Sequence, residues 1–145
     1  MSKSVPPLPT NLKHHPLYAI YYKPFDLYAP DTDTKYISIG QSSWDDRCLS
    51  VKIWRHTGTQ WSRQAEEVPA ARMIDAVIVL AYYLRLREFS GQGVQPVPKG
   101  TFVGQTNDVW PILPAGMSDL SLDLDLPWLE KRLSVLKQVL DNLGF

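Results

Sequence analysis

The segment from Ala70 to Glu88 most constrains the fold of this chain, because its apolar residues repeat with the period of an α-helix yet cover most of its circumference. Pro69 suits the first turn of such a helix. A helix with so wide an apolar band must be covered on most sides, so we expect it at the centre of the molecule. Its apolar positions are Met73, Ile74, Val77, Ile78, Val79, Leu80, Ala81 and Leu84.

Three segments before this helix predict β-strands. Cys48–Arg55 alternates apolar and polar residues with the period of a half-buried strand. Leu17–Tyr22 and Lys35–Gly40 are rich in the aromatic and branched residues that strands favour. Gly58 allows a tight turn over His56–Thr59, and Gln60–Gln64 is then expected to return as the partner strand of a hairpin.

The C-terminal third predicts short strands and a last helix. Thr101–Val103 and Asp108–Trp110 are candidate edge strands, and Leu120–Leu126 alternates like another strand. Asp125 and Pro127 match the start of a helix that carries Leu129, Leu133, Leu136, Leu140 and Leu143 on one stripe. Gly144 followed by Phe145 resembles a Schellman ending in which Phe145 covers Leu140.

These elements indicate an α+β fold with a single domain: a mainly antiparallel sheet, a central buried helix and a C-terminal amphipathic helix. We expect the domain to cover residues 17–145. Residues 1–16 hold several prolines and the pair His14-His15, which is typical of an extended N-terminal arm.

Composition excludes several function classes. The 15 acidic and 15 basic residues cancel, so neither nucleic acid nor a membrane surface is a favoured partner. Cys48 is the single cysteine and the N-terminus carries prolines where a signal peptide needs an apolar run, so we expect a cytoplasmic protein. No metal-ligand spacing and no phosphate-binding glycine motif is present, and we expect neither metal nor cofactor.

The densest cluster of polar and aromatic residues surrounds the predicted turn. We expect its side chains to form a binding surface for a protein partner or for self-association, because tryptophan beside arginine is typical of interface hot spots. Trp44 lies on a neighbouring predicted element and extends this surface. A structural interpretation stays open, in which the tryptophans are core residues and the charged residues form surface ion pairs. The expected binding residues are Trp54, Arg55, His56, Trp61, Arg63 and Gln64.

The same cluster also fits a catalytic alternative. His56 is placed to act as a general acid or base, with Glu66 or Glu67 orienting its ring. Arg55 and Arg63 are then expected to hold the anionic group of a phosphate-bearing metabolite or nucleotide. This small enzyme or ligand-binding domain is the alternative to a cytoplasmic interaction module of the accessory, regulatory or antagonist kind, for which no catalytic residue is expected.

Parts of the chain resemble a small bacterial family that is catalogued only as a domain of unknown function. The resemblance implies a bacterial or phage origin and a compact domain, and it implies no activity. It is most specific from Trp54 to Asp75 and extends over Lys35 to the end of the chain, except for Gly91 to Pro114, which departs from the family, as does the proline-rich arm. The residues that carry it are Ser38-Ile39-Gly40, Val51 to Gly58, Trp61 to Gln64, Glu66 to Pro69 and the terminal Leu143-Gly144-Phe145.

Overall fold

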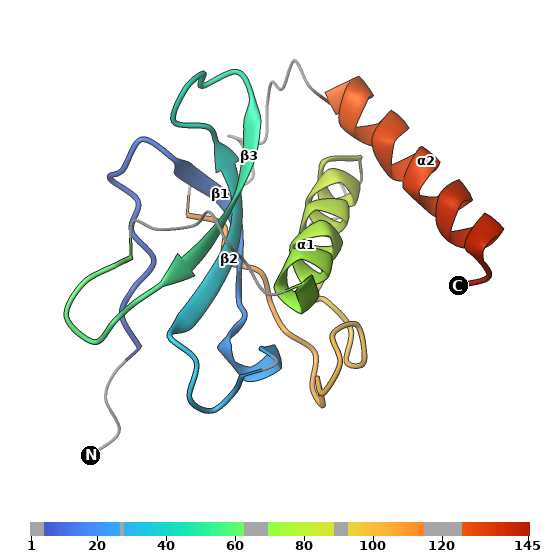
Figure 1. The fold of residues 1–145 in the computed structure, drawn as a ribbon. Coiled ribbons are helices and arrows are strands. Elements are labelled where there is room, and N and C mark those ends of the chain that lie inside the picture. The colour runs from blue at the N-terminus through green and yellow to red at the C-terminus, as the bar shows by residue number, and fades with distance from the viewer. Residues whose placement is uncertain (1–4, 27, 63–69, 89–92, 115–125) are drawn as a thin grey trace.

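The computed structural model describes residues 5–26, 28–62, 70–88, 93–114 and 126–145. It confirms the expected α+β class, with one three-stranded antiparallel sheet and two long helices (Figure 1). Figure 1 shows α1 lying along one face of the sheet, and α2 on the far side of α1. In chain order the elements are β1 (His15–Tyr21), the 3₁₀ helix η1 (Lys23–Phe25), β2 (Thr34–Gln41), β3 (Leu49–Arg55), α1 (Ala70–Glu88) and α2 (Leu126–Leu143).

The sheet is a meander in which β2 lies between β1 and β3. The three predicted strands are confirmed with shifts of one or two residues at their ends, and β1 begins inside the segment expected to be the arm. Because side chains alternate along a strand, the register gives the sheet two different faces. Ile37 and Ile39 of β2 face α1, whereas Tyr36 and Ser38 point to the opposite face, beside Trp54 and Lys52 of β3.

The main core fills the space between the sheet and α1. The predicted helix is confirmed at Ala70–Glu88, and its buried side chains meet tyrosines and isoleucines of β1 and β2. Met73 and Ile74 in its first turns are nevertheless 54% and 63% exposed, so the helix is less completely covered at its start than its composition predicts. The buried residues of this core include Tyr18, Ile20, Tyr22, Ile37, Ile39, Ala76, Val79, Tyr83 and Leu84.

Residues 93–114 pass along the sheet and contribute to the core without forming a strand. Val97 pairs with Val109, and Ile112 pairs with Ala19 of β1, each through a single antiparallel bridge. The expected strand at Thr101–Val103 is wrong: this stretch is a turn region between Gly100 and Gly104, both with positive φ. Phe102 is 1% exposed there, its ring packs against Tyr22 and Phe25, and its amide donates to Oε1 of Gln105.

The expected C-terminal helix is confirmed as α2, and so is its Schellman ending. Gly144 has φ +86°, its N–H donates to Asp141 O, and the N–H of Phe145 donates to Leu140 O. The Phe145 side chain itself stays 88% exposed. The strand expected over Leu120–Leu126 falls mostly outside the described residues, and its last residue begins α2.

Candidate functional site

The predicted turn after β3 is present and is held by its own polar groups. His56 and Trp61 form an antiparallel bridge, and the N–H of Thr57 donates to Gln60 O at 2.9 Å. Gly58 has φ +104°, as the turn requires, and its N–H donates to Nδ1 of His56 at 3.1 Å. Nδ1 is therefore an acceptor in the neutral ring, which leaves the proton on Nε2.

Arg55 forms an ion pair with Asp33, and one third of its side chain stays exposed. Its Nε lies 3.2 Å from both carboxylate oxygens of Asp33, and Nη2 lies 3.1 Å from Oδ2. The backbone reinforces this pair, since the N–H of His56 donates to Asp33 O. This charge-assisted, nearly bidentate contact favours the structural interpretation of the arginine.

Trp54 and Trp61 are in contact but differ in exposure. Trp54 is 1% exposed and its indole N–H donates to Ser38 Oγ at 2.7 Å, which makes it a core residue of the face away from α1. Trp61 is half-buried and packs edge-on against Trp54 and against His56, with ring centroids 5.6 and 4.9 Å apart. Trp44 is 75% exposed in the β2–β3 loop, at the opposite end of β3, so it does not extend this pair into a patch.

The remaining members of the predicted site, Arg63, Gln64, Glu66 and Glu67, lie outside the described residues. Their roles as binding residues, or as partners of a catalytic His56, stay predictions. The structure therefore brings together Trp54, His56 and Trp61 of the expected cluster, and it directs Arg55 toward Asp33.

A histidine of the N-terminal arm belongs to the same face of the sheet, which sequence reasoning missed. His14 is 4% exposed, and its ring lies edge-on against Trp54 between two serines. Nδ1 is 2.7 Å from Ser50 Oγ and Nε2 is 2.9 Å from Ser38 Oγ. The histidine pair in a proline-rich arm gave no hint of this, but Ser38 and Ser50 are small polar residues on strands that otherwise carry bulky ones.

The donors and acceptors of this network can be assigned as one series of hydrogen bonds from Trp54 to Ser50. Ser38 Oγ accepts from Trp54, so its own proton is satisfied by donation to Nε2 of His14. We therefore assign the proton of the neutral ring to Nδ1, which donates to Ser50. Burial and the positive charge of Lys52 lower the pKa of His14 to about 4. A ring that donates to Ser50 and has so low a pKa is poorly suited to activate that serine as a nucleophile at neutral pH.

Gly40 allows the arm to cross the sheet at this point. A Cβ at position 40 would lie 2.1 Å from the carbonyl oxygen of His15 and 2.9 Å from Nε2 of His14. Both contacts are far closer than van der Waals separation. A side chain here would push the arm off the sheet, and the glycine is therefore needed to seat His14 between its serines.

A second buried polar cluster joins the β1–β2 loop to α1. Nε of Arg72 lies 3.1 Å from each oxygen of Asp26, and its Nη2 donates to Thr32 Oγ1 at 3.0 Å. Burial opposes the charge of Asp26, but hydrogen bonds from Arg72 and Thr32 bring its pKa below the usual value. Nearby, the buried Tyr22 hydroxyl donates to Asp75, whose pKa is raised by burial.

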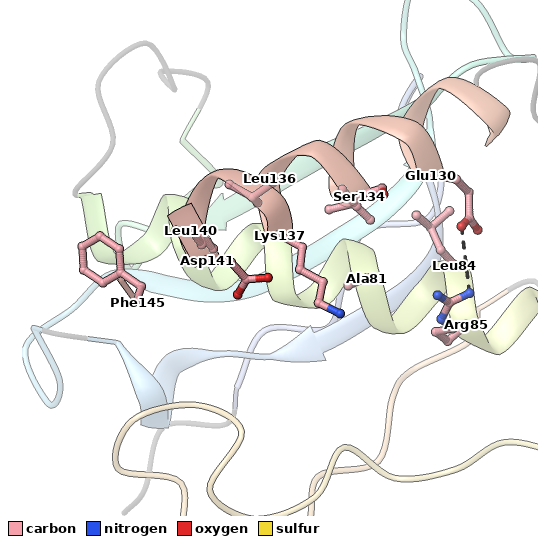
Figure 2. Close-up of a pocket in the computed structure, with 11 residues that line it drawn as sticks. Ala81, Leu84, Arg85, Glu130, Ser134, Leu136, Lys137, Leu140, Asp141 and Phe145 are labelled. Atoms are coloured by element: carbon pink, nitrogen blue, oxygen red, sulfur yellow. Dashed lines mark ion pairs between the residues drawn. The ribbon is translucent and has the colours of Figure 1, made fainter. Parts of the chain in front are cut away.

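A hollow lies between the two helices, away from the predicted site. It encloses about 710 Å³, with apolar side chains such as Ala81, Leu84 and Leu140 between its charged edges. Figure 2 shows Arg85 of α1 facing Glu130 of α2 across it, in an ion pair of 3.9 Å, with Lys137 and Asp141 farther along the same helix. Leu126, Leu129 and Leu133 of α2 are partly buried against the core, and no residue of α2 is fully buried.

Within the described ranges, no helix is long and apolar enough to cross a membrane. No group of three or more His, Cys, Asp or Glu side chains among the same residues could hold a metal ion.

Comparison with known proteins gives one result. Residues 7–89, more than half of the chain, match the model of a family described as a family of unknown function (DUF6530). The matched range runs from the arm to the end of α1, so it starts earlier than the expected resemblance and does not reach the final helix. No curated protein and no solved structure matches.

Proposed function

We propose that this chain, which belongs to the DUF6530 family of unknown function, is a protein-interaction module that serves as an accessory, regulatory or antagonist protein. The proposal includes a bacterial origin and a cytoplasmic location, both of which rest on the sequence. One observation carries it: an amphipathic helix of 18 residues, α2, contains no buried residue.

The surface of α2 is unusually apolar for a helix at the edge of a monomer. Large exposed apolar side chains mark interaction surfaces when they are contiguous, and scattered single ones do not. Here they follow one another along a single helix and its C-terminal residue. They are Trp128, Val135, Leu136, Val139, Leu140, Leu143 and Phe145, each at least 40% exposed.

The hairpin remains a second proposed contact region. Thr57, Gly58, Thr59 and Gln60 are exposed at its tip, and the half-buried Trp61 lies just behind them. The contacts of Trp61 with Trp54 and His56 imply that truncating this side chain would lower stability as well as any binding. For the catalytic alternative, the described contacts of His56 are a turn amide and an aromatic ring, and neither favours acid–base chemistry.

Photo-crosslinking in cells tests the interaction function directly. A benzophenone side chain at Val139, which is 44% exposed, should give a UV-dependent protein adduct. The matched control is the same group at Gln138, the neighbouring residue, which points about 100° away around the helix. Absence of any adduct from position 139, or equal adducts from both positions, would contradict an interaction surface on α2.

A further inference from the structure

The face of the sheet opposite α1 carries a row of aromatic rings. Tyr36 of β2 lies between Tyr21 and Trp61, with ring centroids 5.6 and 6.1 Å away. Tyr36 is 6% exposed, whereas Tyr21 and Trp61 are half-buried. Trp61 in turn contacts Trp54, which ties the row to the core of this face. We call Tyr21, Tyr36 and Trp61 the aromatic row.

The N-terminal arm contacts this row through its prolines. Figure 1 shows the segment before β1 on the side of the sheet away from α1. The Tyr36 hydroxyl donates to the carbonyl oxygen of Pro6 at 2.9 Å. Pro6, Leu8 and Pro9 are half-buried, whereas Pro7 is exposed. The arm is therefore bound here by a backbone acceptor and by some of its side chains, and not by all of them.

The burial of residues 5–10 fits the period of a polyproline II helix. Proline fixes its own φ and restricts the preceding residue to extended backbone, so three prolines within four residues favour this helix. The helix has about three residues per turn and no internal hydrogen bonds, which leaves its carbonyls for an outside donor. Pro6 and Pro9 then share one edge, which is half-buried. Pro7 and Thr10 share another edge, which is exposed.

We infer that the aromatic row is a binding site for a proline-rich segment of a partner protein, and that residues 5–9 occupy it as a built-in ligand. Surfaces lined by aromatic rings bind P-x-x-P segments in this helical form. Pro6-Pro7-Leu8-Pro9 has that spacing, and Tyr36 supplies the donor to its backbone. The inference rests on the proposed interaction function, and it names the chemistry of the partner for a surface separate from α2.

The built-in ligand can leave its site without unfolding the sheet. Residues 5–9 contain no fully buried side chain, and residues 10–13 after them are all exposed. The arm is fixed beyond this point by His14, which is seated between Ser38 and Ser50. A competing segment therefore has to displace residues 5–9 alone, while His14 stays in place.

A partner protein, rather than a second copy of this chain, is the expected occupant. The arm of each copy is connected to its own site by a few residues, which gives it an effective concentration in roughly the millimolar range. Exchange between copies would replace one arm by an identical one and add no contact at this site. A different protein can add contacts with the half-buried Trp61 and with the exposed turn at residues 57–60.

Fluorescence anisotropy of a labelled peptide with the sequence of residues 5–11 tests the inference on the full chain. Pro6→Asp/Pro9→Asp, the opened variant, places two carboxylates against the negative faces of the rings and should displace the arm. It should bind the peptide roughly ten-fold more tightly than the wild-type chain, whose arm competes for the site. Pro7→Asp/Thr10→Asp adds the same charges on the exposed edge and should bind like wild type. Circular dichroism should show both variants folded, since residues 5–10 contain no fully buried side chain.

Two further changes test the contacts themselves. Tyr36→Phe in the opened variant keeps the ring and removes the donor, so it should weaken peptide binding roughly two- to ten-fold. In the peptide, Pro6→Ala/Pro9→Ala should abolish measurable binding, whereas Pro7→Ala should retain most of it. These results would locate the peptide on the aromatic row by the same edge that the arm uses.

A folded opened variant that binds no peptide would overturn the inference. Equal binding of the two altered peptides, or equal opening of the site by the two arm variants, would do the same. A wild-type chain that dimerises in sedimentation equilibrium, with the dimer lost in the opened variant, would assign the site to the arm of a second copy and overturn the partner protein. These measurements do not involve α2. Crosslinking from Val139 would therefore still support the proposed function if the peptide fails to bind.

Discussion

His14 shows how one buried side chain can connect the arm, two strands and a tryptophan. Its two ring nitrogens meet Ser38 of β2 and Ser50 of β3, while its edge contacts the Trp54 ring. Ser38 is shared, since it also accepts the indole N–H. Polar groups buried without such partners would each cost about 1–3 kcal/mol, so the network holds the arm in one position.

Stability should depend on pH through His14. Its folded pKa, about 4, is below the unfolded value of 6.5, so the unfolded state binds more protons between these values and stability is lost as pH falls. From pH 7 to pH 5 the free energy of unfolding should decrease by about 2 kcal/mol through this group. Urea unfolding at both pH values measures the change.

Variants of His14 and of its neighbour His15 show whether His14 causes this pH dependence. His14→Gln removes the titrating ring, so most of this pH dependence should disappear, although the variant is less stable throughout. His15→Gln is the matched control, because His15 is exposed and hydrogen-bonds to Thr10 O in the arm. A His14 variant that keeps the full difference between pH 7 and pH 5 would show that other groups cause it.

The arm could not be placed from its own residues. Prolines and a histidine pair predict an extended segment, but nothing in that composition indicates burial. His14 is buried because two strands distant in sequence leave small side chains beneath it. The pairing of Arg55 with Asp33 was also missed, because it depends on the register of β2 and β3.

At the scale of elements, the buried ion pair of Asp26 and Arg72 holds the β1–β2 loop, which follows η1, against α1. The side chain of Asp26 is 0% exposed and that of Arg72 is 9% exposed. Arg72→Ala should lower the free energy of unfolding by about 3–5 kcal/mol, because the carboxylate would stay buried without its partner. Denaturant unfolding at pH 7 measures this loss.

The exposed pair of Arg47 and Asp45 serves as the control for that substitution. Its two charged groups lie 3.0 Å apart, but the arginine side chain is 67% exposed, and water replaces the contact when it is lost. Arg47→Ala should therefore leave the unfolding midpoint unchanged within error. A small effect of Arg72→Ala, comparable to that of Arg47→Ala, would contradict a structural role for the buried pair.

Helices and alternating strands could be predicted where the apolar residues repeat with one period over many positions. The boundaries of α1 follow from Pro69 and from the apolar repeat, and β3 follows from its strict alternation. A strand was wrongly predicted at Thr101–Val103 because β-branched and aromatic residues favour strands. Gly100 and Gly104, both with positive φ, make this stretch a turn region instead. In α2 the leucine stripe was visible, and the spacing of Trp128, Val135 and Val139 was the overlooked signal of a second apolar face.

At the scale of the whole molecule, the core depends on residues 93–114 but hardly on α2. A chain that ends at Pro114 should keep cooperative thermal unfolding, with a loss of about 2–3 kcal/mol for the partly buried leucines of α2. A chain that ends at Glu88 should lose cooperative unfolding, because Val97 and Phe102, each 1% exposed, leave the core. Thermal unfolding followed by circular dichroism distinguishes them, and equal behaviour of the two truncations would contradict this division.

Gly40 has a further consequence for recognising related chains. Because a side chain at this position would collide with the His15 carbonyl, a relative can seat its arm across the sheet in the same way only if glycine occupies the equivalent site. The pairing of this glycine with an upstream histidine is thus a diagnostic signature. Chains that share the strands but have a larger residue at the equivalent of Gly40 should leave the Trp54 face of their sheet uncovered by the arm. That face would then be part of their exposed surface.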